Sequence, residues 1–279
     1  MISRGRVKVP GCIAALIVAL GTAATLALSS SVALAQTAPT PVVRQSPVET
    51  PKRVLFLGNS LVYYNGALQT HTHRIAAAAT PPLMVRDGFK SVHITSAFLH
   101  HYPIEFLVQP ANVGFKEPFE IVVLGGSIQE AMTDAARAKY RQTAIAFDAV
   151  IKKHGGKTAL LWLPAVVKPN PLADSDMFGK TQDLMLSVGN EIGALIIPVG
   201  LAYQEAYRQR PGIKLQMGYD GSHPTVAGQY LAGAVVYGSL YGKSAVGNPY
   251  DYFGALDKDT KDFVQRVADE TVRKFFGRD

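Results

Sequence analysis

A short apolar run that ends at a glycine constrains the fold of this chain more than any other stretch. Residues 54–57 read Val-Leu-Phe-Leu, Gly58 and Asn59 follow, and a hydroxyl side chain arrives at Ser60. An apolar run of this length is typical of a strand that is buried on both faces, as in a parallel sheet. Ligands bind beyond the carboxyl ends of such strands, so the turn after residue 57 is a candidate functional position.

The rest of the chain alternates between short apolar runs and helical patterns. Candidate strands span residues 54–57, 92–95, 121–124, 158–163 and 194–199, and helices are expected at 67–79, 134–154, 177–192, 225–240 and 258–276. The helix at 134–154 has the clearest signals, because Thr133 can cap its start, Gly155 can end it, and Tyr140, Ala144, Phe147 and Ile151 form one apolar stripe. This alternation predicts one α/β domain with three α/β/α layers and about five parallel strands.

The first 35 residues have the layout of a secretory signal peptide. Three basic residues, Arg4, Arg6 and Lys8, precede an apolar run over residues 12–28, and Ala33-Leu34-Ala35 supplies small residues at a cleavage site. A retained membrane anchor is the alternative, but the run is short and interrupted by glycine, serine and threonine, which favours a signal. We therefore expect an exported protein, periplasmic or secreted, with no stable membrane insertion after cleavage.

Cleavage after Ala35 would change both the cysteine content and the charge of the protein. It would remove Cys12, the only cysteine, so the core must be stable without disulfides. The formal net charge of +7 would fall to +4, and no run of Lys or Arg follows, so a nucleic-acid partner is not expected. Residues 36–51 contain four prolines and read as a flexible Pro/Thr-rich linker, which leaves residues 52–279 as the domain.

A carboxylate and an imidazole lie three residues apart near the other end of the chain. Asp220 and His223 precede Pro224, which suits the first turn of a helix. At this spacing the carboxylate can accept from one ring nitrogen and leave the other to face Ser60, as a base and its orienting acid do beside a nucleophilic serine. Taken alone, Ser60 is typical of a helix N-cap and Asp220 of a capping residue beside a surface histidine. Both signals in one chain favour a serine hydrolase.

These two motifs resemble those of the SGNH (GDSL-type) hydrolase superfamily. Gly58-Asn59-Ser60 after the first strand and Asp220-Gly221-Ser222-His223 near the C-terminus are similar to its first and last blocks, in the branch that has Gly-Asn-Ser rather than Gly-Asp-Ser. The resemblance covers about residues 53–242. It implies a flavodoxin-like sheet, ester hydrolysis through an acyl-serine, and neither a metal nor another cofactor. Carried over by position, Ser60 is the nucleophile, His223 the base and Asp220 its partner.

The middle motifs depart from the superfamily pattern, which has a glycine after the second strand and Gly-x-Asn after the third. Here the second strand leads to Ser96, and Ser127 stands where the asparagine is expected, with Gln129 as the nearest carboxamide. The resemblance therefore implies an oxyanion hole built from the Ser60 N–H, a backbone N–H near Ser96, and either Ser127 or Gln129. A missing donor would raise the barrier enough to make a slow enzyme.

Four other histidines do not have the pattern of a metal site. His71 and His73 would point in divergent directions on a helix, as would the adjacent His100 and His101, and no carboxylate follows at a metal-site spacing. We expect surface or supporting roles for them, with His100 or His101 near the pocket because they follow the second strand.

The expected function is that of an exported esterase that removes a short acyl group, such as acetyl, from a carbohydrate or a small-molecule ester. Tyr63 and Tyr64 are candidates for contact with a sugar or an acyl group, whereas Trp162 is expected in the core. The irregular segments 164–176 and 208–218 are expected to shape the pocket. A binding protein with an incomplete oxyanion hole and an acyltransferase that uses the same serine are the alternatives.

Overall fold

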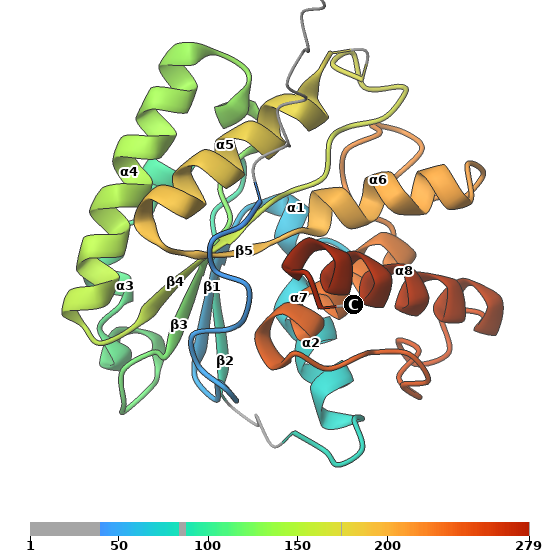
Figure 1. The fold of residues 1–279 in the computed structure, drawn as a ribbon, viewed down its shortest axis with the longest axis horizontal. Coiled ribbons are helices and arrows are strands. Elements are labelled where there is room, and N and C mark those ends of the chain that lie inside the picture. Colours follow the sequence, from blue (N-terminus) through green and yellow to red (C-terminus); the bar gives the residue numbers. More distant parts are fainter. Residues whose placement is uncertain (1–39, 84–87, 174, 279) are drawn as a thin grey trace, which may run out of the picture. The chain divides into compact units, whose positions relative to one another are not determined.

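The computed structural model describes residues 40–83, 88–173 and 175–278, so the signal peptide expected at residues 1–35 lies outside the described residues. The described part belongs to one compact unit whose centre is a parallel sheet in the order β2-β1-β3-β4-β5 (Figure 1). The strands are β1 (Val54–Gly58), β2 (Phe89–His93), β3 (Ile121–Leu124), β4 (Lys157–Leu161) and β5 (Leu195–Ile197). This confirms the predicted five-stranded parallel sheet with three-layer α/β/α architecture.

Alternate residues of the central strand face opposite helical layers. In β1, Val54 and Phe56 belong to one core, and Leu55 and Leu57 belong to the other. The first core is covered by α2 (Leu68–Ala77), α6 (Val199–Gln209), α7 (Val226–Tyr241) and α8 (Lys258–Phe276). The second is covered by α3 (Ile104–Leu107), α4 (Asp134–Lys153) and α5 (Met177–Ile192), and Figure 1 shows the two groups of helices on either side of the sheet. Burial on both faces explains why β1 has no polar alternation.

Helix α4 follows the signals read from its sequence. The Thr133 hydroxyl accepts from the Ala136 N–H at 3.2 Å, and Asp134 begins the first turn, where a negative charge favours the helix dipole. The expected stripe of Tyr140, Ala144, Phe147 and Ile151 is buried in the second core. The predicted end of the helix is confirmed within one residue.

The position of β2 and the presence of α6 are among the differences from the sequence-based expectation. Strand β2 lies at Phe89–His93 rather than at 92–95, because it is a half-buried edge strand whose pairing with β1 begins at Phe89↔Val54. An apolar run is a poor guide to such a strand. Helix α6 was not expected, because the sequence predicts a strand over residues 194–199. In the structure the strand ends earlier, and α6 begins directly after Pro198.

Residues 40–51, the described part of the expected linker, are hydrogen-bonded to the domain. A flexible tether would not make such bonds. The Val42 N–H donates to Asn190 Oδ1 at 2.8 Å, and the Asn190 amide donates to the Thr40 carbonyl at 2.9 Å. Farther along, the Pro51 carbonyl accepts from the Tyr241 hydroxyl at 2.9 Å. Proline lowers the entropy that a segment loses on ordering, so few such bonds can hold it.

Candidate active site

The turn after β1 presents Ser60 at the start of α1 (Ser60–Tyr63). A Cβ atom on Gly58 would lie 2.4 Å from Val62 Cγ2, so only glycine lets the chain reverse this closely onto the first turn of the helix. The buried Asn59 caps the helix, because its Oδ1 accepts from the Leu61 N–H at 3.1 Å. The Ser60 N–H lies in the first turn, where helical N–H groups have no partner within the helix.

The structure brings Ser60, His223 and Asp220 into one hydrogen-bonded chain. His223 Nε2 lies 2.9 Å from Ser60 Oγ, and His223 Nδ1 contacts Asp220 Oδ2. An ionised carboxylate can only accept, so the proton between the last two atoms belongs to Nδ1. Nε2 is then the acceptor for the serine hydroxyl, which is the arrangement needed to withdraw its proton.

Asp220 is held in its ionised form by donors on both of its oxygens. Partial burial by itself would raise the pKa of Asp220, but the bond from His223 and those from backbone N–H groups outweigh it and lower the pKa. Two of these backbone bonds, from Ser222 at 2.8 Å and His223 at 3.1 Å, end on Oδ1. They leave Oδ2 directed at the imidazole.

Glycine is required in the loop that carries this carboxylate. Gly221 has φ +62°, and a Cβ atom there would lie 1.9 Å from the Val167 carbonyl oxygen. The Val167 N–H donates to the Gly221 carbonyl at 2.8 Å, and the Asn170 amide donates to the Asp220 carbonyl at 3.1 Å. The segment expected to shape the pocket at residues 164–176 therefore supports the loop that carries Asp220 and His223.

A second loop, residues 64–67, holds the imidazole from the side of α1. The ring of Tyr64 stacks on His223 with centroids 4.2 Å apart. The amide of the next residue, Asn65, donates to the Pro224 carbonyl at 2.6 Å. The loop has three successive residues with positive φ from 65 to 67, a conformation that turns the chain back toward α2.

His71 in α2 is buried and supports the same loop, so of the surface and supporting roles expected for it the structure shows the supporting one. Its side chain is fully buried, and its Nε2 lies 2.9 Å from the Asn65 carbonyl. Burial lowers the pKa of His71 to about 4, although the bond to Asn65 opposes this. The neutral ring therefore donates from Nε2 to the Asn65 carbonyl. The burial of His71 could not be predicted from local sequence, because the rings of Tyr250 and Tyr252 that pack against it come from a distant segment.

The three oxyanion candidates have different surroundings. Ser96 is exposed and has φ +57°, the conformation that favours the glycine of the superfamily pattern at this place. Ser127 precedes the 3₁₀ helix η3 (Ile128–Ala131), and its Oγ accepts from the Gln129 N–H at 3.3 Å. The Gln129 side chain is exposed. Ser127 therefore has a hydroxyl hydrogen that its cap role does not use.

Asn59 connects the loops that carry Ser96 and Ser127 to the turn that carries Ser60. Its Nδ2 donates to the Ala97 carbonyl at 3.1 Å and to the Gly126 carbonyl at 3.0 Å, next to Ser96 and Ser127 respectively. The loops after β2 and β3 thus lie beside Ser60.

Glu130 is a feature of the site that the sequence reading did not identify. It is only 2 % exposed, and its carboxylate accepts from the Ser127 N–H at 2.6 Å and the Leu99 N–H at 2.9 Å. Burial raises the pKa of Glu130 to about 7, despite those two donors. The one available signal was the Ser-x-x-Glu spacing from Ser127, which is that of a capping box.

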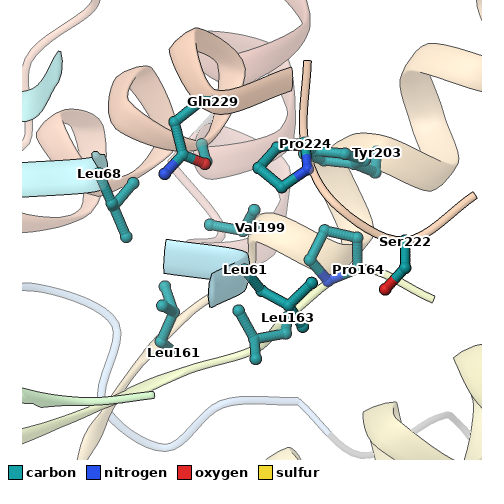
Figure 2. Close-up of a pocket in the computed structure, with 11 residues that line it drawn as sticks. Leu61, Leu68, Leu161, Leu163, Pro164, Val199, Tyr203, Ser222, Pro224 and Gln229 are labelled. Carbon is teal, nitrogen blue, oxygen red and sulfur yellow. The ribbon is translucent and has the colours of Figure 1, made fainter. Parts of the chain in front are cut away.

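A small apolar cavity lies beside the loop of His223. Figure 2 shows Leu61, Leu163 and Val199 around it, with Ser222 and Pro224 at its side. Its volume of about 10 Å³ is enough for one water molecule. The cavity therefore has no room for a long acyl chain.

The aromatic residues near the site differ in exposure. Tyr219 is 63 % exposed and directly precedes Asp220, and Tyr64 stacks on His223. The Tyr63 hydroxyl lies 3.3 Å from Thr95 Oγ1. Trp162, in contrast, is fully buried and donates to Thr181 Oγ1 at 3.2 Å, as expected for a core residue.

Over residues 40–83, 88–173 and 175–278, no group of three or more His, Cys, Asp or Glu side chains is arranged to hold a metal ion. His100 and His101 are exposed, and the His101 Nδ1 accepts from the Phe98 N–H at 3.1 Å. In that same part of the chain, no helix combines the length and apolar character needed to cross a bilayer.

Several solved structures are similar to this protein in fold. The sequence matches no family model and no curated protein. A DUF4886 family protein from Bacteroides uniformis aligns with a TM-score of 0.60 at 16% identity, over 79% of this chain and 94% of that one. A candidate SGNH hydrolase from Slackia heliotrinireducens aligns with a TM-score of 0.52 at 20% identity, over 68% and 98%.

A third similar structure is a variant of an acetyl-xylooligosaccharide esterase from Geobacillus, with a TM-score of 0.52 at 15% identity, over 71% of this chain and 98% of that one. The chain therefore has the fold of the SGNH (GDSL-type) hydrolases.

Proposed function

We propose that this protein is an exported serine esterase that hydrolyses carboxylic esters of short acyl groups through an acyl-serine intermediate. The observation that carries the proposal is the chain of contacts from Ser60 Oγ through both nitrogens of His223 to Asp220. A serine hydroxyl is a weak nucleophile at neutral pH, and a base at 2.9 Å with an orienting carboxylate behind it is what activates such a group.

In the acylation step, Ser60 Oγ attacks the ester carbonyl carbon while its proton moves to His223 Nε2. The carbonyl oxygen becomes an oxyanion, which the Ser60 N–H and the loops after β2 and β3 would stabilise. Collapse of this tetrahedral intermediate breaks the bond to the alcohol oxygen, and the imidazolium returns the proton to that oxygen. Asp220 stabilises the imidazolium without taking its proton.

Deacylation repeats these steps with water. His223 Nε2 accepts a proton from the water molecule that attacks the acyl carbon, and the acid is released when Ser60 Oγ regains a proton from the imidazolium. His223 carries out every proton transfer in the two steps.

Three observations support a short acyl group and a carbohydrate alcohol. The cavity beside Leu61 and Ser222 holds about one water molecule, which leaves no space there for a long acyl chain. The exposed ring of Tyr219 can stack on a sugar, and one similar structure is named as an acetyl-xylooligosaccharide esterase. The N-terminal signal pattern supports export, where polysaccharide esters would be met.

The proposal is tested with p-nitrophenyl acetate and acetylated xylo-oligosaccharides. Wild-type protein should hydrolyse both, and Ser60→Ala should lose at least about 1,000-fold in kcat. The matched control is Ser187→Ala, since the Ser187 hydroxyl bonds only locally to the Leu184 carbonyl. Retention of activity by a folded Ser60→Ala variant would refute the proposal.

A further inference from the structure

Two buried side chains tie the loop after β2 to the loop after β3. Asn59 acts as the donor, with its amide on the carbonyls of Ala97 and Gly126. Glu130 acts as the acceptor, with one carboxylate oxygen on the N–H of Leu99 and the other on the N–H of Ser127. Each side chain thus holds one residue from each loop, so the spacing of the loops depends on both.

A capping box explains only half of the contacts of Glu130. Such a glutamate accepts from the N-cap N–H, here that of Ser127, and does so as well on a protein surface. It does not require the second bond to Leu99, which lies 31 residues earlier in the chain. Nor does it require burial, which raises the pKa of Glu130 and so disfavours its charged form.

The backbone above the carboxylate is shaped to admit it. A Cβ atom on Gly126 would lie 2.1 Å from Glu130 Oε2, so a side chain at position 126 would displace the carboxylate. Gly126 is also the residue whose carbonyl Asn59 binds. Because position 126 is glycine, the Asn59 amide and the Glu130 carboxylate can both pack against this loop.

The use of backbone N–H groups by Glu130 limits what can bind an oxyanion. The N–H of Ser127 is already donated to the carboxylate, so it is not free to bind a substrate. The hydroxyl of Ser127 accepts from the Gln129 N–H, which leaves its hydrogen as the group that this residue can donate. Its direction depends on the backbone that Glu130 holds.

We propose that Glu130 is a positioning residue for ester hydrolysis, which fixes the Ser127 hydroxyl as an oxyanion donor by holding the N–H groups of Ser127 and Leu99. This inference rests on the proposed function, and it adds a residue outside the serine, histidine and aspartate chain. Glu130 touches no reacting atom, because its oxygens are occupied by backbone donors in the interior.

The test is a double-mutant cycle with Glu130→Gln and Ser127→Ala, assayed with p-nitrophenyl acetate. Glutamine keeps the shape but has only one acceptor oxygen, so it can retain only one of the two backbone bonds. We expect each single variant to lose about 10- to 100-fold in kcat, with KM changed less than about threefold. Since Glu130 acts through Ser127, the double variant should be no more than about threefold slower than the slower single variant.

Active-site titration with a fluorophosphonate makes the cycle independent of the folded fraction, because kcat is then expressed per reactive serine. Glu117→Gln is the matched control, since the Glu117 side chain is 69 % exposed, and its kcat should stay within about twofold of wild type. Losses that multiply in the double variant, or an unchanged kcat per titrated site in Glu130→Gln, would overturn the inference.

The design separates this inference from the proposed function. If wild-type protein neither reacts with the fluorophosphonate nor hydrolyses the ester, the proposed function itself fails. If wild type is active, only the role of Glu130 is under test. Should Glu130→Gln fail to fold, Ser127→Ala decides, because a wild-type kcat in that variant would refute a hydroxyl donor that Glu130 positions.

Discussion

In wild-type protein, Glu130 is expected to lower the free energy of unfolding as pH rises from about 4.5 to about 7. The variant Glu130→Gln should not show this decrease. Burial raises the pKa of Glu130 from 4.5 to about 7, against the opposing bonds from Ser127 and Leu99. Tyr102 and Tyr140 face the same carboxyl and stay uncharged over this range, because burial raises the pKa of both. A carboxyl whose pKa is higher in the folded state than in the unfolded state favours folding while protonated, and this contribution is lost as pH rises through the folded pKa. The difference between the two pKa values corresponds to roughly 3 kcal/mol.

Urea unfolding at pH 4.5, 6 and 7.5 measures this effect. The free energy of unfolding of wild type, minus that of Glu130→Gln, should fall by roughly 3 kcal/mol between the first and last pH. The same difference for the control Glu117→Gln, an exposed carboxylate, should change by less than about 1 kcal/mol. Subtracting the variant removes the contribution of every other titrating group. Parallel curves for wild type and Glu130→Gln would show that the carboxyl is not perturbed and would refute the reasoning.

Three further changes test the supports of the site. Gly221→Ala should lower the free energy of unfolding by about 2 to 4 kcal/mol, measured in urea, because its Cβ would meet the Val167 carbonyl at a positive φ. Asn65→Gly keeps the backbone permissive but loses the bond to the Pro224 carbonyl, so kcat should fall about 5- to 10-fold in a steady-state assay. Tyr219→Ala should raise KM at least about fivefold for acetylated xylo-oligosaccharide, while kcat/KM for p-nitrophenyl acetate stays within about twofold.

Each of these has its own control and its own refuting result. Gly212→Ala is the glycine control, since its Cβ would meet open space, and equal losses at both glycines would contradict the steric argument. An unchanged kcat in Asn65→Gly would mean that the imidazole needs no support from this loop. If Tyr219→Ala affects both substrates alike, the exposed ring does not contact the sugar.

Local turn chemistry explains why part of the site was predictable from sequence. Gly58, Asn59 and Ser60 act within one strand-to-helix turn, and Asp220 and His223 within another, so each motif carries its own geometry. The turn with Ser60 lies at the carboxyl end of β1, as expected for a parallel sheet. The loop with Asp220 and His223 follows α6 rather than a strand, so its place beside Ser60 depends on tertiary contacts such as the bond from Asn65 to the Pro224 carbonyl.

Features that depend on distant partners were not predictable. The contact of Glu130 with Leu99 exists only because η3 and the loop after β2 are brought together by the fold. The order of residues 40–51 depends on side chains such as Asn190 and Tyr241, which no local pattern connects to that segment. Composition alone therefore suggested a tether where tertiary hydrogen bonds form.

The most direct test of the central claim is to label the protein with a fluorophosphonate and map the modified peptide. The account predicts stoichiometric modification at Ser60, about 100-fold slower labelling in His223→Ala, and no labelling in Ser60→Ala. Modification at another serine, or ester hydrolysis that persists in a folded Ser60→Ala variant, would contradict it.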